Sequence, residues 1–200
     1  MIKVFYIERT DRAKFWLRRF AKGPCTATPG QYSYHNAMTL IGEGPDKKVI
    51  GDKHDHNDPR WPTTCACGYI FNEKDDWQLF HRTIYKRTDT GEEMTREEAP
   101  VGACYNAHWA AEDKEDGFMI GPDGLCLVVK TPGGDWYIDS RAGNCAMPND
   151  NNHKCWVRHG NVLDGTLHVD KQGITCAAGA GSIAIGSYHG FLHAGFLTDT

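Results

Sequence analysis

The sequence predicts a predominantly β fold of the α+β class, made of antiparallel hairpins with few short helices and a zinc-knuckle-like insertion. Glycine is frequent, with 22 in 200 residues, and long apolar stretches with the period of a helix are scarce, which together favour strands and turns. Eight cysteines, two of them in the segment CACG, indicate a knuckle that holds a metal ion.

A single domain over residues 1–200 accounts for the length and the composition. Hydrophobic residues make up 40% and charged residues 24% of the chain, which is enough for a core of ordinary size. No Gly- and Ser-rich linker separates the first 60 residues from the remainder. We therefore expect residues 1–60 to pack on residues 61–200.

Net charge and hydropathy restrict the partners. A net charge of −4 gives no global attraction to nucleic acid or to an anionic membrane, so neither is an expected partner. No segment reaches the roughly 18 apolar residues of a membrane helix, and the apolar run 4–7 is too short for the core of a signal peptide. We expect a protein made in the cytosol, where close cysteine pairs are more often metal ligands than disulfides.

The chain begins with a strand over residues 2–8, and residues 10–21 then fit two structures. Thr10 or Asp11 fits the N-cap of an amphipathic helix, whereas the alternation of apolar and basic residues from Phe15 onwards fits a strand. The arginines and aromatic residues of this segment also fit a surface that binds phosphates and bases. The acidic balance of the chain favours a solvated face instead.

Residues 23–62 are typical of loops around one strand near residues 37–43. His54 and His56 lie there between carboxylates, which makes them candidates for a metal cluster. Asp, His and Asn are equally common in solvated loops, which is the alternative interpretation.

Four hairpin-like segments are predicted in the remainder of the chain. They cover residues 77–95, 125–139, 161–176 and 182–192. Asp89–Gly91 and Pro132–Gly134 form the turns of the first two, because Asp and Gly allow the positive φ angles of tight turns.

Cys65 and Cys67 form the predicted knuckle, because two thiolates one residue apart approach one cation when Gly68 relieves the strain of the turn. The segment GACYNAHW adds Cys104 and His108, which complete the four S or N ligands that Zn²⁺ prefers. Sulfur ligands favour Zn²⁺ over Mg²⁺ or Ca²⁺. We predict one Zn²⁺ on these four residues, the alternative being a pair of half-buried thiols.

A second cysteine group lies further along the chain. Cys145, His153 and Cys155 occur in a polar, turn-rich segment and are candidates for a second metal ion, with Cys126 or Cys176 as a further partner. A disulfide between Cys145 and Cys155 is the alternative in an oxidising compartment.

Ser182 and His189 are the candidate catalytic pair. A two-residue turn at residues 186–187 places both side chains on one face of a hairpin, diagonally opposed. The imidazole can then accept the proton of the serine hydroxyl, as a serine nucleophile requires, and nearby glycines offer N–H groups to an oxyanion. Asp139 or Asp170 is the candidate third group, and ordinary turn and packing roles are the alternative for the serine and the histidine.

The segments CACG, GDWYI, GSI and YHGFLHAG resemble the BubE-like family, a phage and bacterial domain family linked to bacterial ubiquitin-like operons. The order of these segments agrees with the family over residues 61–200, and the segment GPDGLCLVVKTPGGDWYIDSRAGNC resembles uncharacterised proteins of tailed phages. The resemblance implies a peptidase-like pair on Ser182 and His189, with Gly181 where the family has proline.

Two functions are expected from these observations. The first is a phage-encoded, zinc-stabilised hydrolase that cleaves a peptide or a related acyl bond in the cytoplasm of a bacterial host. The second is a non-catalytic virion or accessory protein at a capsid or tail interface, because six Trp and eight each of Tyr and Phe suit contacts with a protein partner. An exposed aromatic face favours assembly, and an open cleft at Ser182 favours catalysis.

Overall fold

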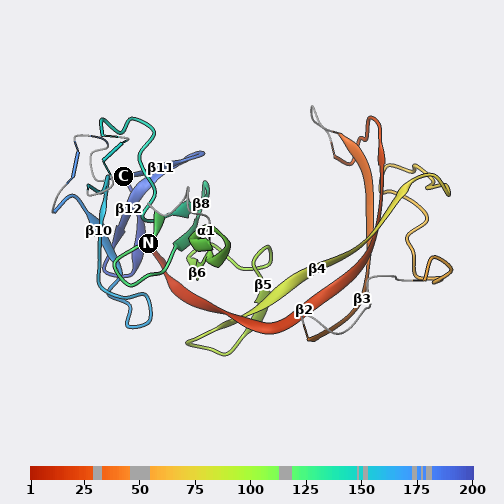
Figure 1. Ribbon diagram of the computed structural model, residues 1–200, viewed down its shortest axis with the longest axis horizontal. Coiled ribbons are helices and arrows are strands. Elements are labelled where there is room, and N and C mark those ends of the chain that lie inside the picture. Colours follow the sequence, from red (N-terminus) through yellow and green to blue (C-terminus); the bar gives the residue numbers. More distant parts are fainter. Residues whose placement is uncertain are drawn as a thin grey trace. The chain divides into compact units, whose positions relative to one another are not determined.

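The computed structural model describes residues 1–28, 33–45, 55–112, 119–147, 149–150, 153–172, 175–176, 178 and 182–200. These residues form almost exclusively strands and turns (Figure 1). The helical element among them is α1 (His108–Glu112). The predicted class, predominantly β with antiparallel hairpins and few short helices, is confirmed.

The chain divides into two compact units. Unit 1 comprises Met1–Arg9 and Tyr85–Thr200, and unit 2 comprises Thr10–Ile84. Each unit has buried hydrophobic clusters of its own. The prediction that residues 1–60 pack on residues 61–200 as a single domain stays a prediction.

Unit 2 is built on three long strands that lie side by side (Figure 1). β2 (Phe5–Lys22) pairs antiparallel with β3 (Tyr34–Pro45), and β4 (Asp76–Arg87) borders β2 on its other edge. Every second side chain from Ala13 to Ala21 is buried. This period of two identifies residues 10–21 as a strand and excludes the helix that the sequence left open.

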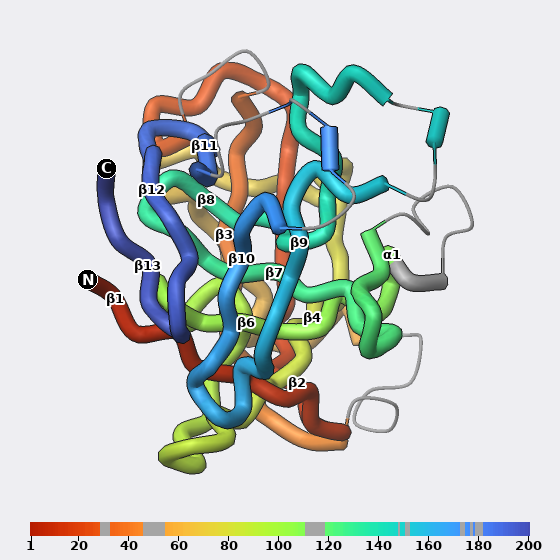
Figure 2. The backbone as a smooth tube through the Cα atoms, turned by 90° about the vertical axis from the view of Figure 1, so that its left-hand side faces the viewer, coloured from red at the N-terminus to blue at the C-terminus, as the bar shows by residue number. Residues whose placement is uncertain are grey.

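The described strands of unit 1 are short (Figure 2). They are β1 (Ile2–Lys3), β5 (Glu93–Thr95), β6 (Ala103–Asn106), β7 (Leu127–Thr131), β8 (Gly134–Tyr137), β9 (Val157–His159), β10 (His168–Asp170), β11 (Ile183–Ile185), β12 (Tyr188–His193) and β13 (Phe196–Asp199). One sheet has the order β1-β13-β12-β11, and β6, β7 and β8 form an antiparallel meander beside the first residues of β2. β9 and β10 pair antiparallel, and β10 lies next to β12.

Buried side chains cover both faces of β7. Leu127 and Val129 belong to one hydrophobic cluster, together with the tryptophans at 136 and 156. Cys126 and Val128 belong to a second cluster on the opposite face. Because both faces are covered, the run LCLVV is apolar at every position, as expected for a fully buried strand.

Three of the four predicted hairpins are found. Residues 77–95 contain β4 and β5, residues 125–139 contain β7 and β8, and residues 182–192 contain β11 and most of β12. In residues 161–176 the prediction is wrong, because β10 pairs with β9, which precedes that segment. A hydrogen bond of 3.1 Å from the N–H of Thr166 to the carbonyl of Asn161 closes the loop between β9 and β10. The turn of this hairpin therefore precedes β10.

Candidate metal centres and the serine–histidine pair

Three cysteines and one histidine converge beside the β2–β3 hairpin of unit 2. Cys25 follows β2, and His35 lies on β3 opposite Ala21. Cys65 and Cys67 come from the turn that carries the segment CACG. One ligand atom from each of the four side chains lies within 4.8 Å of the other three. We call this set the first Cys/His group.

The spacing inside the first Cys/His group fits tetrahedral zinc. Cys25 Sγ lies 3.7 Å from Cys65 Sγ, and His35 Nδ1 lies 3.2 Å from Cys67 Sγ. Bonds of about 2.3 Å to sulfur and about 2.0 Å to nitrogen place the ligands of a tetrahedron about 3.5 to 3.8 Å apart. The group therefore needs only small movements to bind one Zn²⁺.

The knuckle has the predicted local structure. The N–H of Cys65 donates to the carbonyl of Tyr69 at 2.9 Å, and the N–H of Gly68 donates to the carbonyl of Cys65 at 2.9 Å. Gly68 adopts a φ of +92°, a backbone conformation that residues with a Cβ rarely adopt. The ring of His35 stacks on that of Tyr69 with 4.0 Å between their centroids, which orients the imidazole toward the thiols.

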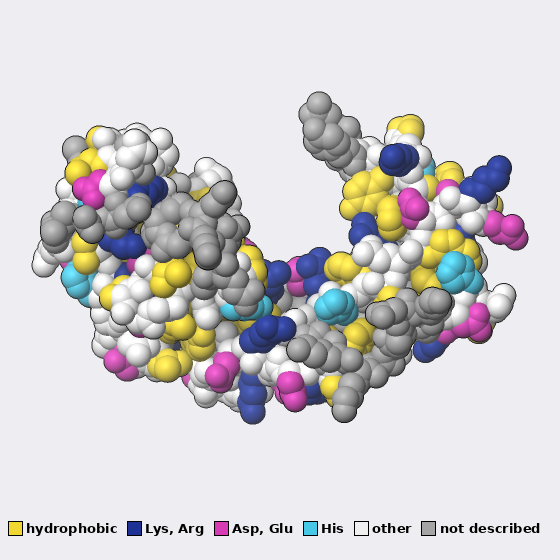
Figure 3. Space-filling view, in the orientation of Figure 1, with side chains coloured by type: hydrophobic (Ala, Val, Ile, Leu, Met, Phe, Trp, Pro, Cys, Tyr) yellow, Lys and Arg dark blue, Asp and Glu magenta, His cyan; other side chains and the backbone are white. Residues whose placement is uncertain are grey.

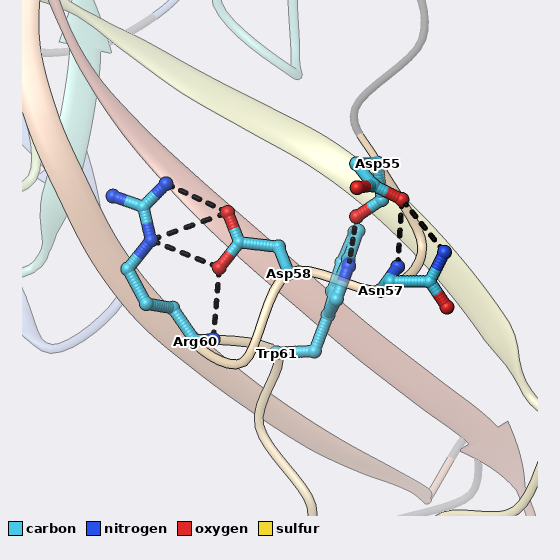
Figure 4. A network of polar contacts seen from close by, with 5 residues as sticks. All are labelled: Asp55, Asn57, Asp58, Arg60 and Trp61. Atoms are coloured by element: carbon cyan, nitrogen blue, oxygen red, sulfur yellow. Dashed lines mark hydrogen bonds and ion pairs between the residues drawn. The ribbon is translucent and has the colours of Figure 1, made fainter.

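A polar network fixes the segment that leads into the knuckle (Figure 4). The carboxylate of Asp55 accepts the N–H of Asn57 at 2.9 Å, and the indole of Trp61 donates to the carbonyl of Asp55 at 3.0 Å. Arg60 and Asp58 form an ion pair at 2.7 Å. The turn thus holds Trp61 in a buried position, four residues before the first cysteine of the knuckle.

Cys104 and His108, the predicted completing ligands, lie outside this group and belong to unit 1. Cys104 is on β6 with no exposed surface, and burial raises the pKa of its thiol to about 12. His108 Nε2 lies 3.0 Å from a guanidinium nitrogen of Arg9. The positions assigned to them are taken by Cys25 and His35, which the sequence interpretation missed. The available signal was the spacing of a cysteine just after one strand and a histidine at the start of the next.

A second Cys/His group lies in unit 1 and consists of Cys145, His153, Cys155 and Cys176, with ligand atoms again within 4.8 Å of one another. The sulfurs of Cys155 and Cys176 are 3.7 Å apart, and Cys145 Sγ lies 3.2 Å from His153 Nε2. Of the two partners that the sequence offered, Cys176 completes the group. Cys126 is instead buried in a hydrophobic cluster that includes residues of β6 and β7.

The histidine of the second group is oriented toward the thiols. Its Nδ1 lies 2.8 Å from the carbonyl of Asp150. When Nδ1–H donates to this carbonyl, Nε2 keeps its lone pair and points toward the thiols, which is the usual arrangement of a zinc-bound histidine.

Lys171 joins the two halves of the second group. Its ammonium donates to the carbonyls of Cys155, Cys176 and Ala178 at 2.7, 2.9 and 2.6 Å. Two of these carbonyls belong to ligand residues, so the lysine holds two ligand-bearing segments at a fixed separation.

All eight cysteines are free. The alternative of a disulfide between Cys145 and Cys155 is therefore wrong for this structure. A disulfide requires its sulfurs about 2.05 Å apart, whereas metal ligands keep the wider spacing seen in both groups.

Each group contains at least one thiol whose pKa is lowered. A hydrogen bond with Thr28 is the largest cause that lowers the pKa of Cys25 to about 6. Burial acts to raise the pKa of Cys145, but hydrogen bonds from the N–H of Met147 and from His153 lower it to about 6. A thiolate is the metal-binding form of cysteine, so each group presents at least one ligand that is already deprotonated near neutral pH.

Ser182 and His189 lie on one face of the β11–β12 hairpin and contact each other. Ala184 pairs with His189 and Ile185 pairs with Tyr188, which leaves Gly186 and Ser187 in the turn as predicted. His189 Nε2 lies 2.9 Å from Ser182 Oγ. The other face of the hairpin is buried at residues 183, 188, 190 and 192, so the pair is on the outer face.

The third group beside His189 is Thr200. Its hydroxyl lies 3.3 Å from His189 Nδ1. Asp139 faces Arg158 at 3.4 Å, and Asp170 faces His159 at 3.1 Å. Both proposed carboxylates are thus engaged with other partners, and a neutral hydroxyl stands where a carboxylate was expected.

His54 and His56 are the other histidines that the sequence offered as metal ligands. His54 lies outside the described residues. The ring of His56 packs against that of Trp77 with 4.1 Å between their centroids, and His56 belongs to neither Cys/His group of the described residues. In the described part of the chain, the helical segment is too short to cross a membrane.

Comparisons with protein-family models, with curated proteins and with solved structures found no match to this chain.

Proposed function

We propose that this chain is a zinc protein in which each Cys/His group binds one Zn²⁺ and thereby holds the loops of its unit. The observation that carries the proposal is the convergence of three cysteines and one histidine within 4.8 Å in each group. Sites with four protein ligands leave no position for water or substrate, so both ions are structural.

The proposed role follows from where the ligands come from in the chain. The first group joins the β2–β3 hairpin to the knuckle some 30 to 40 residues later, from Cys25 and His35 to Cys65 and Cys67. The second joins the segments that flank β9 and β10. A bound ion adds to the free energy of folding of these segments, because metal binding is linked to folding.

Zinc content measured on single variants tests the proposal. Protein purified without chelator should contain two zinc ions per chain, one for each group. The variants Cys25→Ser and Cys176→Ser should each lose one ion. Cys104→Ser and Cys126→Ser are matched controls, because both cysteines are buried outside the groups, and they should keep both ions. Protein without zinc, or loss of an ion on Cys104→Ser but not on Cys25→Ser, would contradict the proposal.

A second candidate function is hydrolysis of a peptide or related acyl bond by Ser182. The specific observation in its favour is the 2.9 Å contact between His189 Nε2 and Ser182 Oγ, since a serine nucleophile must transfer its proton to a base within hydrogen-bonding reach. In this mechanism the serine oxygen attacks the carbonyl carbon while Nε2 takes the proton. His189 then returns the proton to the leaving group, and Thr200 orients the ring through Nδ1.

Labelling with a fluorophosphonate probe tests this second candidate. Ser182 should be modified, and Ser182→Ala or His189→Ala should abolish labelling. Ser187→Ala is the matched control, because this serine lies in the exposed turn of the same hairpin and is not the residue that contacts Nε2 of His189. Equal labelling of wild type and Ser182→Ala would remove the hydrolase from consideration.

The place where the protein works and the partner it acts on stay predictions. The resemblance to the BubE-like family supports a phage-encoded protein that works in the cytoplasm of a bacterial host, on a protein or peptide, or that occurs in the virion as an accessory protein. Detection of this chain in purified phage particles would distinguish the virion role from the hydrolase role.

A further inference from the structure

We propose that one face of the part of the sheet that β2, β3 and β4 form in unit 2 binds single-stranded nucleic acid. The face is the side of β2, β3 and β4 that carries Trp16, Arg18, Phe20, Met38, Phe80 and Arg82, and we call it the aromatic face. This site is separate from both Cys/His groups and from the serine–histidine pair.

The side chains of the aromatic face belong to one surface. Trp16 pairs with Leu40 and Arg18 pairs with Met38 across the β2–β3 ladder, and paired residues share a face of the sheet. The ring of Trp16 lies 5.9 Å from that of Phe80 on β4. All three strands therefore contribute to the same surface.

The two faces of this sheet differ in their exposure. Phe15, Leu17 and Arg19 point to the opposite face and are each buried, at 4, 0 and 7% exposure. The guanidinium of Arg19 lies 4.6 Å from the ring of Trp77 on that side. The aromatic face instead keeps Met38 at 48% and Leu40 at 52% exposure, and exposed apolar residues gathered on one sheet face indicate an interaction site.

Arginines lie on the aromatic rings of this face. The guanidinium of Arg18 is 4.9 Å from the centroid of the Phe20 ring and 5.8 Å from that of Phe80, and the guanidinium of Arg82 is 4.5 Å from Phe80. Arg18 donates to the neutral side chains of Asn36 and Gln78, so these contacts leave its charge uncompensated. Figure 3 shows basic side chains next to hydrophobic ones over this part of the chain.

The charge of the aromatic face selects an anionic partner. By the alternation of β2 and β4 it carries Arg12, Lys14, Arg18, Lys22 and Arg82 against Glu43 and Asp76. The net charge of −4 is a sum over the whole chain and does not show this local excess of positive charge. For this reason nucleic acid was not expected as a partner from the sequence.

The occupant is a single strand and not a duplex or a second copy of this chain. Aromatic rings and guanidinium planes bind unstacked bases, while the basic side chains contact the phosphates between them. A duplex keeps its bases stacked on one another and does not offer them to the rings of this face. A symmetric dimer through this face would place its arginines near one another, and that repulsion disfavours it.

Fluorescence anisotropy with the full zinc-loaded chain and a labelled oligothymidylate of about 16 nucleotides tests the proposal. Contacts of Arg18, Lys22 and Arg82 with three phosphates predict a slope of about −2 in a plot of log affinity against log salt, which is about a twentyfold loss between about 50 and about 200 mM. Phe80→Ala should weaken binding about tenfold or more through the loss of one stacked base. Arg18→Gln should weaken binding and flatten the salt slope by about 0.7.

Matched controls separate the face from general effects. Lys3→Gln removes one exposed positive charge from β1, which belongs to unit 1, and should leave affinity unchanged. Phe196→Ala removes an exposed ring from β13 and should also leave the affinity for the oligonucleotide unchanged. Zinc content shows whether each variant is folded.

Four results would overturn the proposal. The first three are no binding of the oligonucleotide at low salt, equal binding of single strand and duplex, and unchanged affinity in both Arg18→Gln and Phe80→Ala. The fourth is a wild-type protein that sediments as a dimer and does not bind the oligonucleotide, while these two variants sediment as monomers. The last result would assign the face to a second copy of the chain.

Discussion

Asp139 gives unit 1 a stability that depends on pH in a defined direction. The carboxyl group is 3% exposed and faces Arg158, which also pairs with Asp123. One oxygen of Asp139 is buried without a hydrogen bond. Burial raises the pKa of this carboxyl to about 6 from its ordinary value of 3.8, although the charge of Arg158 acts to lower it.

The magnitude follows from this shift. The unfolded chain loses the proton of Asp139 near pH 4, whereas the folded chain keeps it to about pH 6, so the free energy of unfolding falls as pH rises through this window. A difference of about two pKa units at 1.36 kcal/mol each predicts a total loss of about 3 kcal/mol, complete above about pH 6. Asp139→Asn removes the titrating group and should abolish this term.

Urea unfolding of wild type and Asp139→Asn at a series of pH values measures the effect. Other titrating groups and the zinc ligands contribute equally to both proteins, so the informative quantity is the difference between their free energies of unfolding. The wild type should lose stability relative to the variant by about 3 kcal/mol between about pH 4 and pH 6. Parallel curves over this range would refute the reasoning, because they would mean that Asp139 has the same pKa in the folded and unfolded chain.

Three further outcomes are expected. Lys171→Met should weaken zinc binding at the second Cys/His group about 10- to 100-fold, as for other groups that orient ligands, and a chelator competition assay would show an unchanged affinity if the lysine plays no such part. Ile183→Ala, at 1% exposure, should lower the free energy of unfolding by about 2 to 5 kcal/mol, whereas Leu163→Ala, at 63% exposure, should change it by less than about 0.5 kcal/mol; thermal denaturation with similar losses for both would contradict the assigned core. Tyr105→Phe removes a hydrogen bond of 2.8 Å to Asp135 and should lower the free energy of unfolding by about 1 kcal/mol in the same assay. An unchanged free energy would mean that a water molecule takes the place of the tyrosine hydroxyl.

Local features of the sequence determined three of the four predicted hairpins and the knuckle, but they left residues 10–21 open between a helix and a strand. The register at Gly186 and Ser187, and with it the contact between Ser182 and His189, follows from a period of two and a turn of fixed length, which involve only neighbouring residues. The knuckle is equally local, because Cys65, Cys67 and Gly68 lie within one turn. Such features are encoded in a few consecutive residues and can be predicted without the remainder of the chain.

The tertiary structure alone decided which distant residues meet. Cys104 was as plausible a partner for Cys65 as Cys25, because both lie about 40 residues away and composition does not distinguish a buried core thiol from a ligand. Pairing of β2 with β3 brings Cys25 and His35 together.

The same limit applies to the residue that contacts Nδ1 of His189. Asp139 and Asp170 were candidates because each follows a predicted strand, yet strand pairing places Thr200 there. Long-range pairing depends on the packing of whole strands, and the free energy that selects it is spread over many residues.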